Sequence, residues 1–359
     1  MENKNQVQVS FLATDKYIED NIISPKEIEK KPGEMVYWGT SNDYPNYIED
    51  LYLEVSTLKS IIDGSVDYIC GDEIIDNIKL INTKGHSIGD IVKYVAKDLV
   101  KYGGFALNVI RNKVGGIANI YYIDFKKLRS NKDNTIFYYT EKWDRSYGRL
   151  KYTEIPSFFS SDEPSTIFYY KNDLNYTYPV APIAAAIKSC EIERLINNYH
   201  LNNIVNGFNS SYIINFNSGK PTDEQKAEIE RNFYNKFLGP NNASRPMLSF
   251  NNSKVQETTV TKIDKDDLDQ KYTSLVDHSK QDIFTSFRCS PILFGIDQEK
   301  TGFNANEYKE TFKLFNKTFI QPKQDIIIKS LNKIFGTDNT IEIKPFNIVF
   351  EEDEQKNQI

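Results

Sequence analysis

The spacing of apolar residues along the chain predicts helices first and a sheet after them. Between Tyr47 and Ile62 the apolar positions recur at intervals of three and four, and the same spacing returns over residues 88–102. After the glycine pair at 103–104 the period changes to two, and strand-like stretches continue to about residue 170, beginning with FALNVIRNKVGGIANIYYID. The first half of the chain is therefore predicted to be α+β, with a mostly antiparallel sheet.

The second half is predicted to be mostly helical. One long helix is expected over residues 182–206, where Pro182 lies near the start. A second is expected over residues 264–289, and it ends before Ser290-Pro291 because the residue preceding a proline disfavours the helical conformation. Its apolar face is opposed by polar residues, which include Gln270, Ser274, Asp277 and Gln281.

Residues 208–262, between these helices, are predicted to form a small α/β insertion. Short strands flank one helix, in which Thr222 and Gln225 are placed to form a capping box. Phe233 and Phe237 lie on the apolar face of that helix.

The chain then contains a last long helix between two less regular segments. This helix is predicted over residues 304–336, with a kink or break at Pro322, which removes a backbone donor. The sequence TIEIKPFNIVF alternates as a strand after it, and an acidic tail follows. Residues 1–35 are polar and rich in lysine, and they are expected to form a loosely packed arm.

Composition limits the possible functions. The 359 residues include 44 Lys and Arg against 50 Asp and Glu, a formal net charge of −6, so tight electrostatic binding of nucleic acid is not expected. The three cysteines are far apart and fit neither a disulfide framework nor a metal motif, which favours synthesis in a reducing cytoplasm. Neither a signal peptide nor an apolar run of about 18 residues is present, so no membrane association is predicted.

The residues that could perform chemistry form no catalytic constellation. The three histidines have no metal-ligand spacing, and the acidic run DKDDLD lies at a predicted helix start, where it stabilises the positive end of the helix dipole. The glycine pairs match no phosphate-binding loop. We therefore predict no catalytic residue, no cofactor and no metal.

Cys289 is the one residue that leaves two interpretations open. Its neighbour Arg288 could lower the pKa of the thiol and make Cys289 the nucleophile of a cysteine hydrolase. No histidine is tied to it by a family-type signature, so a semi-buried thiol at a helix end is the simpler interpretation.

Four stretches, taken in their order along the chain, resemble the portal proteins of tailed bacteriophages. They begin with SNDYPNYIEDLYLEVSTLKS, YGGFALNVIRNKVGG, PIAAAIKSCEIERLINNYH and QDIFTSFRCSPILFGIDQEKTGFNANE, and together they span about residues 40–350. The resemblance implies an elongated α+β subunit in which the segments have distinct roles. These are an N-terminal arm (1–35), a wing (36–180), two stem helices (181–207 and 263–289), a clip (208–262), a tunnel loop (290–303), a long kinked helix (304–336), and a C-terminal strand that returns to the wing, with the tail (337–359).

The resemblance also implies a function and partners. Portal proteins are dodecameric rings at one capsid vertex, and double-stranded DNA passes through them during packaging and ejection. They are not the ATPase of the packaging motor. The clip is expected to dock the terminase large subunit and later a head-to-tail adaptor, the wing is expected to contact the major capsid protein, and the mature protein is expected in the virion.

Two features need separate interpretation within this resemblance. Many portals continue into a substantial helical crown, and here a small or absent crown is expected. The tunnel-loop tip is expected to meet the DNA, and the polar stem face either lines the lumen or packs on a neighbouring subunit. The tip comprises Asp297, Gln298, Glu299, Lys300 and Thr301, and the stem face comprises Gln270, Ser274, Asp277 and Gln281.

Two other functions stay possible at this point. One is a different virion connector or minor head protein with its own ring, and the other is the cysteine hydrolase built on Cys289.

Overall fold

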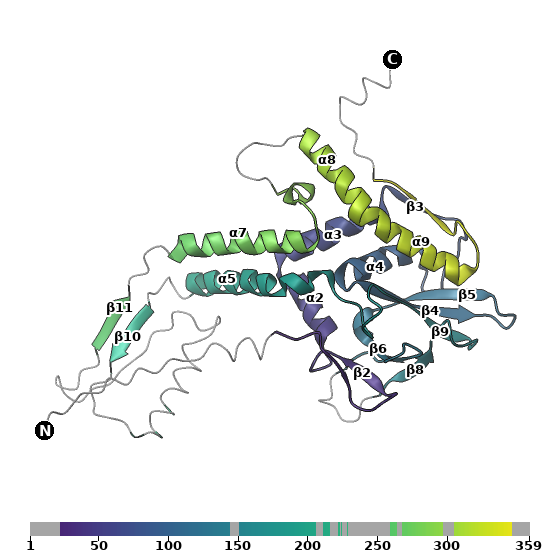
Figure 1. Cartoon of the computed structure of the whole chain (residues 1–359), viewed down its shortest axis with the longest axis horizontal. Helices are drawn as coiled ribbons and strands as arrows, with labels where there is room; N and C mark the ends of the chain where they lie inside the picture. Colours follow the sequence, from purple (N-terminus) through teal and green to yellow (C-terminus); the bar gives the residue numbers. More distant parts are fainter. Residues whose placement is uncertain are drawn as a thin grey trace, which may run out of the picture. The chain divides into compact units, whose positions relative to one another are not determined.

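The computed structural model describes residues 22–143, 151–205, 211–215, 222, 224, 228, 259–263, 268–296 and 305–346 (Figure 1). The chain divides into two compact units. The large unit comprises Ile23–Cys190 and Gln281–Ile359, and the small unit comprises Met1–Ile22 and Glu191–Lys280. Among the described residues, no helix is both long enough and apolar enough to cross a membrane.

Antiparallel sheets form one part of the large unit, as the period of two predicts. A five-stranded sheet has the order β1-β2-β6-β7-β8, and a three-stranded sheet has the order β5-β4-β9. A two-stranded sheet pairs β12 with β3. The strands are β1 (Glu27–Glu29), β2 (Met35–Trp38), β3 (Glu73–Asp76), β4 (Gly104–Arg111), β5 (Ile117–Ile123), β6 (Leu128–Asn131), β7 (Ile136–Tyr139), β8 (Thr153–Pro156), β9 (Ser165–Lys171) and β12 (Ile341–Lys344).

Helix α4 (Ile88–Lys101) covers strands β4 and β5, as Figure 1 shows. It starts with a capping box, in which Ser87 and Asp90 each accept a hydrogen bond from the other's backbone N–H. Its apolar face is buried against the sheet at positions three and four apart, including Ile91, Val95 and Leu99. Helix α4 is therefore the helical layer that packs on the three-stranded sheet.

The apolar spacing between Tyr47 and Ile62 predicts one continuous helix, and this prediction was wrong because the structure has two helices there. Helix α2 (Tyr44–Glu54) ends at Val55, whose backbone is extended, and α3 (Ser56–Cys70) starts directly after it. Val55 is fully buried, and its N–H donates to Leu51 O (2.9 Å). On either side of this break, each helix buries an apolar face.

The N-terminal arm, predicted over residues 1–35, also needs correction where it is described. Residues 27–29 form β1, which pairs with β2. The carboxylate of Glu27 accepts hydrogen bonds from the backbone N–H groups of Thr177 (3.0 Å) and Tyr178 (2.7 Å). This stretch is therefore part of the sheet, and residues 1–21 lie outside the described residues.

In its described residues, the small unit contains parts of two long helices and one strand pair. The helix predicted from Pro182 begins with a 3₁₀ turn, η2 (Pro182–Ala186), and continues as α5 (Ile187–Val205). Helix α7 (Leu268–Ser286) is the second, and the rings of Tyr199 on α5 and Tyr272 on α7 lie 5.1 Å apart. Strands β10 (Ser211–Asn215) and β11 (Thr259–Ile263) pair antiparallel.

The C-terminal part of the large unit is a nearly continuous helical run followed by β12. Helix α8 (Ala305–Phe315) passes through a π-helical turn, η6 (Asn316–Ile320), into α9 (Gln321–Phe335). Gly336 then ends the run in the left-handed conformation (φ 65°). Helix α9 packs on both α3 and α4, so the end of the chain completes the core built by its beginning.

Candidate functional site

The segment that the sequence singles out begins where α7 ends. Arg288 adopts the left-handed conformation (φ 53°), and its N–H donates to Thr285 O (3.0 Å). The N–H of Cys289 donates to Phe284 O (3.2 Å). This pair of bonds is the Schellman motif, which glycine usually makes, and here an arginine occupies the left-handed position. Ser290 and Pro291 follow, so the helix cannot continue.

Cys289 is part of this helix end, and its surroundings favour the neutral thiol. Its thiol donates a weak hydrogen bond to Phe284 O (3.6 Å), the same oxygen that accepts from its backbone N–H. Burial raises the pKa of the Cys289 thiol to about 12. A nucleophilic cysteine needs the opposite shift, because the thiolate is the reactive species. The surroundings of Cys289 therefore do not favour the hydrolase interpretation.

The 3₁₀ turn η5 (Pro291–Phe294) follows and is bound to helix α3 through Tyr68. Tyr68 is buried, and its hydroxyl donates to the carbonyl oxygen of Leu293 (2.6 Å). The same hydroxyl lies 2.9 Å from the hydroxyl of Tyr308 on α8. Burial is the main cause that raises the pKa of Tyr68 above its ordinary value, and the hydrogen bond with Tyr308 adds to it. The Tyr68 hydroxyl therefore stays neutral and can donate.

Aromatic rings surround this hydrogen-bonded centre. Phe294 of η5, Phe312 and Phe315 of α8, and Phe346 after β12 all have ring centroids between 5.0 and 6.2 Å from the Tyr68 ring. We call the set the Tyr68 cluster, and it comprises Tyr68, Leu293, Phe294, Tyr308, Phe312, Phe315 and Phe346.

Gly64 completes the packing one helical turn before Tyr68. A Cβ at this position would lie 2.8 Å from Cδ1 of the Phe294 ring, closer than real Cβ contacts allow. The absence of a side chain at residue 64 therefore lets η5 approach α3 closely.

The predicted DNA-contacting residues are divided between described and undescribed parts of the chain. Asp297, Gln298, Glu299, Lys300 and Thr301 lie outside the described residues, between η5 and α8. On α7, Ser274, Asp277 and Gln281 are exposed, whereas Gln270 is placed in the helix without a described side chain. Of the residues predicted for the helix of the small insertion, Thr222 is exposed, and Gln225, Phe233 and Phe237 lie outside the described residues.

Pro322 lies in the first turn of α9, directly after the π-helical turn η6. A proline is tolerated there because its missing N–H is compensated by the local change in hydrogen-bond pattern. The next residue, Lys323, lies with its ammonium 3.3 Å from the centroid of the Phe319 ring. Burial, together with the nearby positive charge of Arg288, lowers the pKa of Lys323 to about 8.

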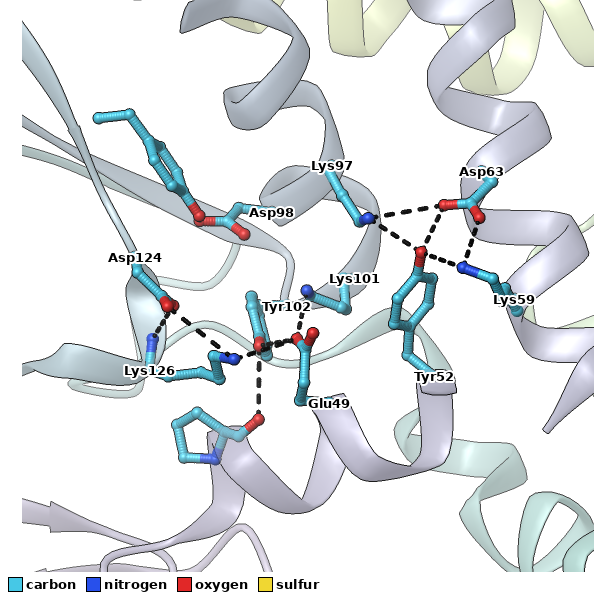
Figure 2. Close-up of polar contacts among 12 residues, drawn as sticks. Glu49, Tyr52, Lys59, Asp63, Lys97, Asp98, Lys101, Tyr102, Asp124 and Lys126 are labelled. Carbon is cyan, nitrogen blue, oxygen red and sulfur yellow. Dashed lines mark hydrogen bonds and ion pairs between the residues drawn. The ribbon is translucent and has the colours of Figure 1, made fainter. Parts of the chain in front are cut away.

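A second polar centre joins helices α2, α3 and α4 around Tyr52 (Figure 2). The Tyr52 hydroxyl accepts from the ammonium groups of Lys59 (2.7 Å) and Lys97 (2.9 Å) and donates to Asp63 (2.7 Å). Nearby, the buried Lys101 pairs with Glu49 at 2.6 Å. We call this set the Tyr52 network, and it comprises Glu49, Tyr52, Lys59, Asp63, Lys97 and Lys101.

Charge pairing fixes the protonation states in the Tyr52 network. Burial raises the pKa of Glu49, but the hydrogen bond and charge of Lys101 outweigh it, so that pKa is lowered overall. The same balance, with Tyr52 as the main donor, lowers the pKa of Asp63.

Asp98, on α4 beside this network, behaves in the opposite way. It is 2% exposed, and Tyr122 donates to its carboxyl group (2.9 Å). Burial raises the pKa of Asp98 to about 8, so the group is mainly neutral at pH 7.

The sequence gives only a partial signal for these centres. Lys59 and Asp63 are four residues apart on a predicted helix, a spacing that indicates a pair. The sequence does not single out Tyr68, because its partners Leu293 and Tyr308 are 225 and 240 residues away. The stripe formed by Tyr308, Phe312 and Phe315 indicates a buried helix face, but not the tyrosine that it meets.

Comparison with known proteins identifies both a family and a fold. Residues 84–356 match the family described as phage portal protein. No curated protein sequence matches the chain significantly.

Solved structures agree with that family. A chain from the virion of a native gene transfer agent particle has a TM-score of 0.57 at 15% identity, covering 91% of this chain and 90% of that one. A chain from the neck of the native particle, computed with C12 symmetry, has a TM-score of 0.56 at 15% identity, with the same coverage. An HK97-family phage portal protein from Corynebacterium diphtheriae has a TM-score of 0.50 at 10% identity, covering 86% and 98%.

Proposed function

The chain belongs to the phage portal protein family, and we propose that it is the portal subunit of a virion, assembled as a dodecameric ring at one capsid vertex. Double-stranded DNA enters through this ring during packaging and leaves through it during ejection. The observation that carries the proposal is the family match over residues 84–356, which includes helices α4, α5, α7, α8 and α9. The family is structural rather than catalytic, in agreement with the raised pKa of Cys289.

The ring itself is proposed by analogy with the solved neck. The neck structures of the gene transfer agent particle were computed with C12 and C6 symmetry, and their chains share this fold. A closed ring of identical subunits needs two different contact surfaces on each subunit, because the interfaces are head-to-tail.

Segments of the chain are assigned proposed roles within that ring. Residues 36–180 form the wing, which contacts the major capsid protein, and residues 208–262 form the clip. The clip docks the terminase large subunit and later a head-to-tail adaptor. Residues 181–207 and 263–289 are the stem, and residues 290–303 are the tunnel loop.

The charge of the chain suits a channel through which DNA slides. A wall that neutralised many phosphates would bind DNA strongly through counterion release and would oppose movement. With a net charge of −6, this chain has no such excess of cations. The exposed Ser274, Asp277 and Gln281 on α7 fit a weakly interacting wall, and they equally fit a contact with a neighbouring subunit.

Imaging of the purified full-length protein tests the proposal directly. We expect averaged particle images to show a twelve-fold ring with an axial hole. A monodisperse monomer at high protein concentration would contradict the assignment.

Charge substitution distinguishes the two positions of the α7 face. If the face lines the lumen, Gln281→Lys together with Asp277→Lys leaves the ring intact and makes it retain DNA in a salt-dependent manner. If the face packs on a neighbour, the same double variant disrupts the ring instead. Lys188→Gln, a charge change on α5, serves as a control for non-specific effects.

Shortening of residues 297–301 tests the tunnel loop. We expect rings to form normally and the yield of DNA-filled particles to fall. Normal packaging by the shortened variant would show that this segment does not act on DNA.

A further inference from the structure

Two points of the chain that are far apart in sequence meet at one oxygen atom. The carbonyl oxygen of Leu293 and the hydroxyl of Tyr308 are bonded to the Tyr68 hydroxyl at 2.6 and 2.9 Å. The distance between the Leu293 carbonyl oxygen and the Tyr308 hydroxyl oxygen therefore cannot exceed the sum of these two bond lengths. Leu293 is the last residue but one of η5, and Tyr308 lies in the first turn of α8.

The direction of each bond follows from the number of protons. A carbonyl oxygen can only accept, so the single proton of the Tyr68 hydroxyl goes to Leu293. The Tyr308 hydroxyl must then donate to the oxygen of Tyr68. The Tyr68 hydroxyl donates one bond and accepts the other, so both bonds can be present together.

The surrounding packing holds this centre in one arrangement. Tyr68 is 7% exposed, and Leu293 is 4% exposed. The Phe294 ring lies against both Tyr68 and Phe315, and it occupies the space that Gly64 leaves open. Loss of the Tyr68 hydroxyl would leave a buried carbonyl without this partner, a costly change that water cannot easily repair.

We propose that Tyr68 is the positioning residue of the tunnel loop: from helix α3 it fixes the point where the chain leaves for residues 297–304 and the point where it returns. This inference rests on the proposed function, since it concerns how the DNA-facing segment is held. Tyr68 does not touch DNA. Its effect is to tie Leu293 and Tyr308, which stand on either side of this segment in the chain, to helix α3.

The test is the variant Tyr68→Phe in the full-length chain, which removes only the hydroxyl. We expect amide hydrogen exchange at Leu293, Gly295 and Ile296 to become roughly tenfold faster in assembled rings. We also expect the yield of DNA-filled particles to fall, with the number and symmetry of rings unchanged.

Tyr178→Phe is the matched control. Tyr178 is also buried (3% exposed) and lies in the same unit. Its hydroxyl donates to Val36 O and accepts from the N–H of Ser130 (3.0 Å). We expect this variant to lose comparable stability while exchange at Leu293 and packaging stay normal. Equal losses of packaging in both variants would show a general stability effect and would overturn the proposal.

Tyr308→Phe provides a milder second variant. It removes the proton donated to Tyr68 but leaves the bond to Leu293, so faster exchange is expected at the start of α8 and not at Leu293. Unchanged exchange in both Tyr68→Phe and Tyr308→Phe would overturn the proposal. Failure of the proposed function is recognised separately, because it requires that shortening residues 297–301 has no effect on packaging.

Discussion

The Tyr52 network and the Tyr68 cluster both centre on a buried tyrosine hydroxyl, but they bind different kinds of partner. Tyr52 contacts charged side chains from α3 and α4, and the side chains of Lys59 and Lys97 are 46% and 36% exposed. Tyr68 contacts a backbone carbonyl and another tyrosine inside a shell of aromatic rings. The first set joins elements that are neighbours in sequence, and the second joins elements more than 200 residues apart.

This difference indicates which centre tolerates change. Partners that reach solvent can replace a lost bond with water, so the net loss of stability is small. Buried partners cannot, and the desolvation cost of the orphaned group remains. We therefore expect polar substitutions near Tyr52 to matter only where the pair is itself buried.

The largest expected effect concerns Asp98, the neutral carboxyl beside the Tyr52 network. Its pKa is about 8 in the folded protein, against about 3.9 in an unfolded chain. The folded state therefore holds an extra proton between these values, and stability falls as pH rises through this window. Asp98→Asn removes this dependence. The free energy of unfolding of this variant, relative to that of the parent protein, should rise by up to about 1.4 kcal/mol per pH unit between pH 5 and 8. Urea denaturation at each pH measures this difference.

Asp90→Asn, on the same helix, is the control of opposite sign. Hydrogen bonds from Ser87 lower the pKa of Asp90, so its contribution is present above the unfolded pKa and is lost as pH falls. Parallel pH profiles for Asp98→Asn and the parent protein would show that Asp98 is ionised in the folded state.

A smaller loss is expected from the buried pair in the Tyr52 network. The side chain of Lys101 is 6% exposed, and Lys101→Met keeps its aliphatic length while leaving Glu49 with less compensation. We expect a loss of about 3 kcal/mol in the free energy of unfolding. Lys59→Met removes a more exposed partner and should cost less than about 1 kcal/mol. Equal losses would mean that burial does not decide the strength of these pairs.

The two hydroxyl groups can be compared directly by removing each. We expect Tyr68→Phe to cost about 2 kcal/mol, because it leaves a buried carbonyl unpaired. Tyr52→Phe should cost less than about 1 kcal/mol, since Lys59, Lys97 and Asp63 stay paired with one another or with water. Chemical denaturation of both variants measures the difference. A larger loss for Tyr52→Phe would reverse the interpretation of the two centres.

The smallest effect concerns glycine in helices. Gly64→Ala forces a methyl group against the Phe294 ring and should destabilise by about 1 kcal/mol, even after the better helix propensity of alanine is counted. Gly89→Ala on α4 places its methyl at ordinary contact distances of 3.6 Å or more, and it should be neutral or slightly stabilising. Thermal unfolding of the pair gives the comparison, and a stabilised Gly64→Ala would show that η5 moves away freely.

Much of the fold could be predicted from local patterns. The apolar spacing on α4, the β-branched and aromatic residues of β4 and β9, and the helix-ending Ser290-Pro291 are all local signals, readable within a few residues of sequence. The break at Val55 could not be predicted, because the apolar spacing continues through it and only the packing of α2 and α3 requires the bend.

The sequence predicts where the candidate site lies along the chain, but not which residues hold it in place. The order of elements indicated a loop after residue 290, and a resemblance to portal proteins supplied its proposed role. Tyr68 could not be identified, because nothing in the sequence near residue 68 indicates which of the distant apolar stripes will pack on it. Cys289 shows the converse, since an apparently chemical residue proved to be part of a helix end.

Tyr68 holds two points of the chain side by side. One lies in η5, after the Schellman motif that ends α7, and the other lies at the start of α8. Two attachment points that lie close together suit the insertion of a peptide, because the inserted segment can start and finish there without distorting the surrounding fold. Doubling the length of a flexible insert adds only about 0.6 kcal/mol of closure cost. This joint is therefore a place where a reporter peptide or a longer natural segment can be exchanged while the described part of the large unit keeps its fold.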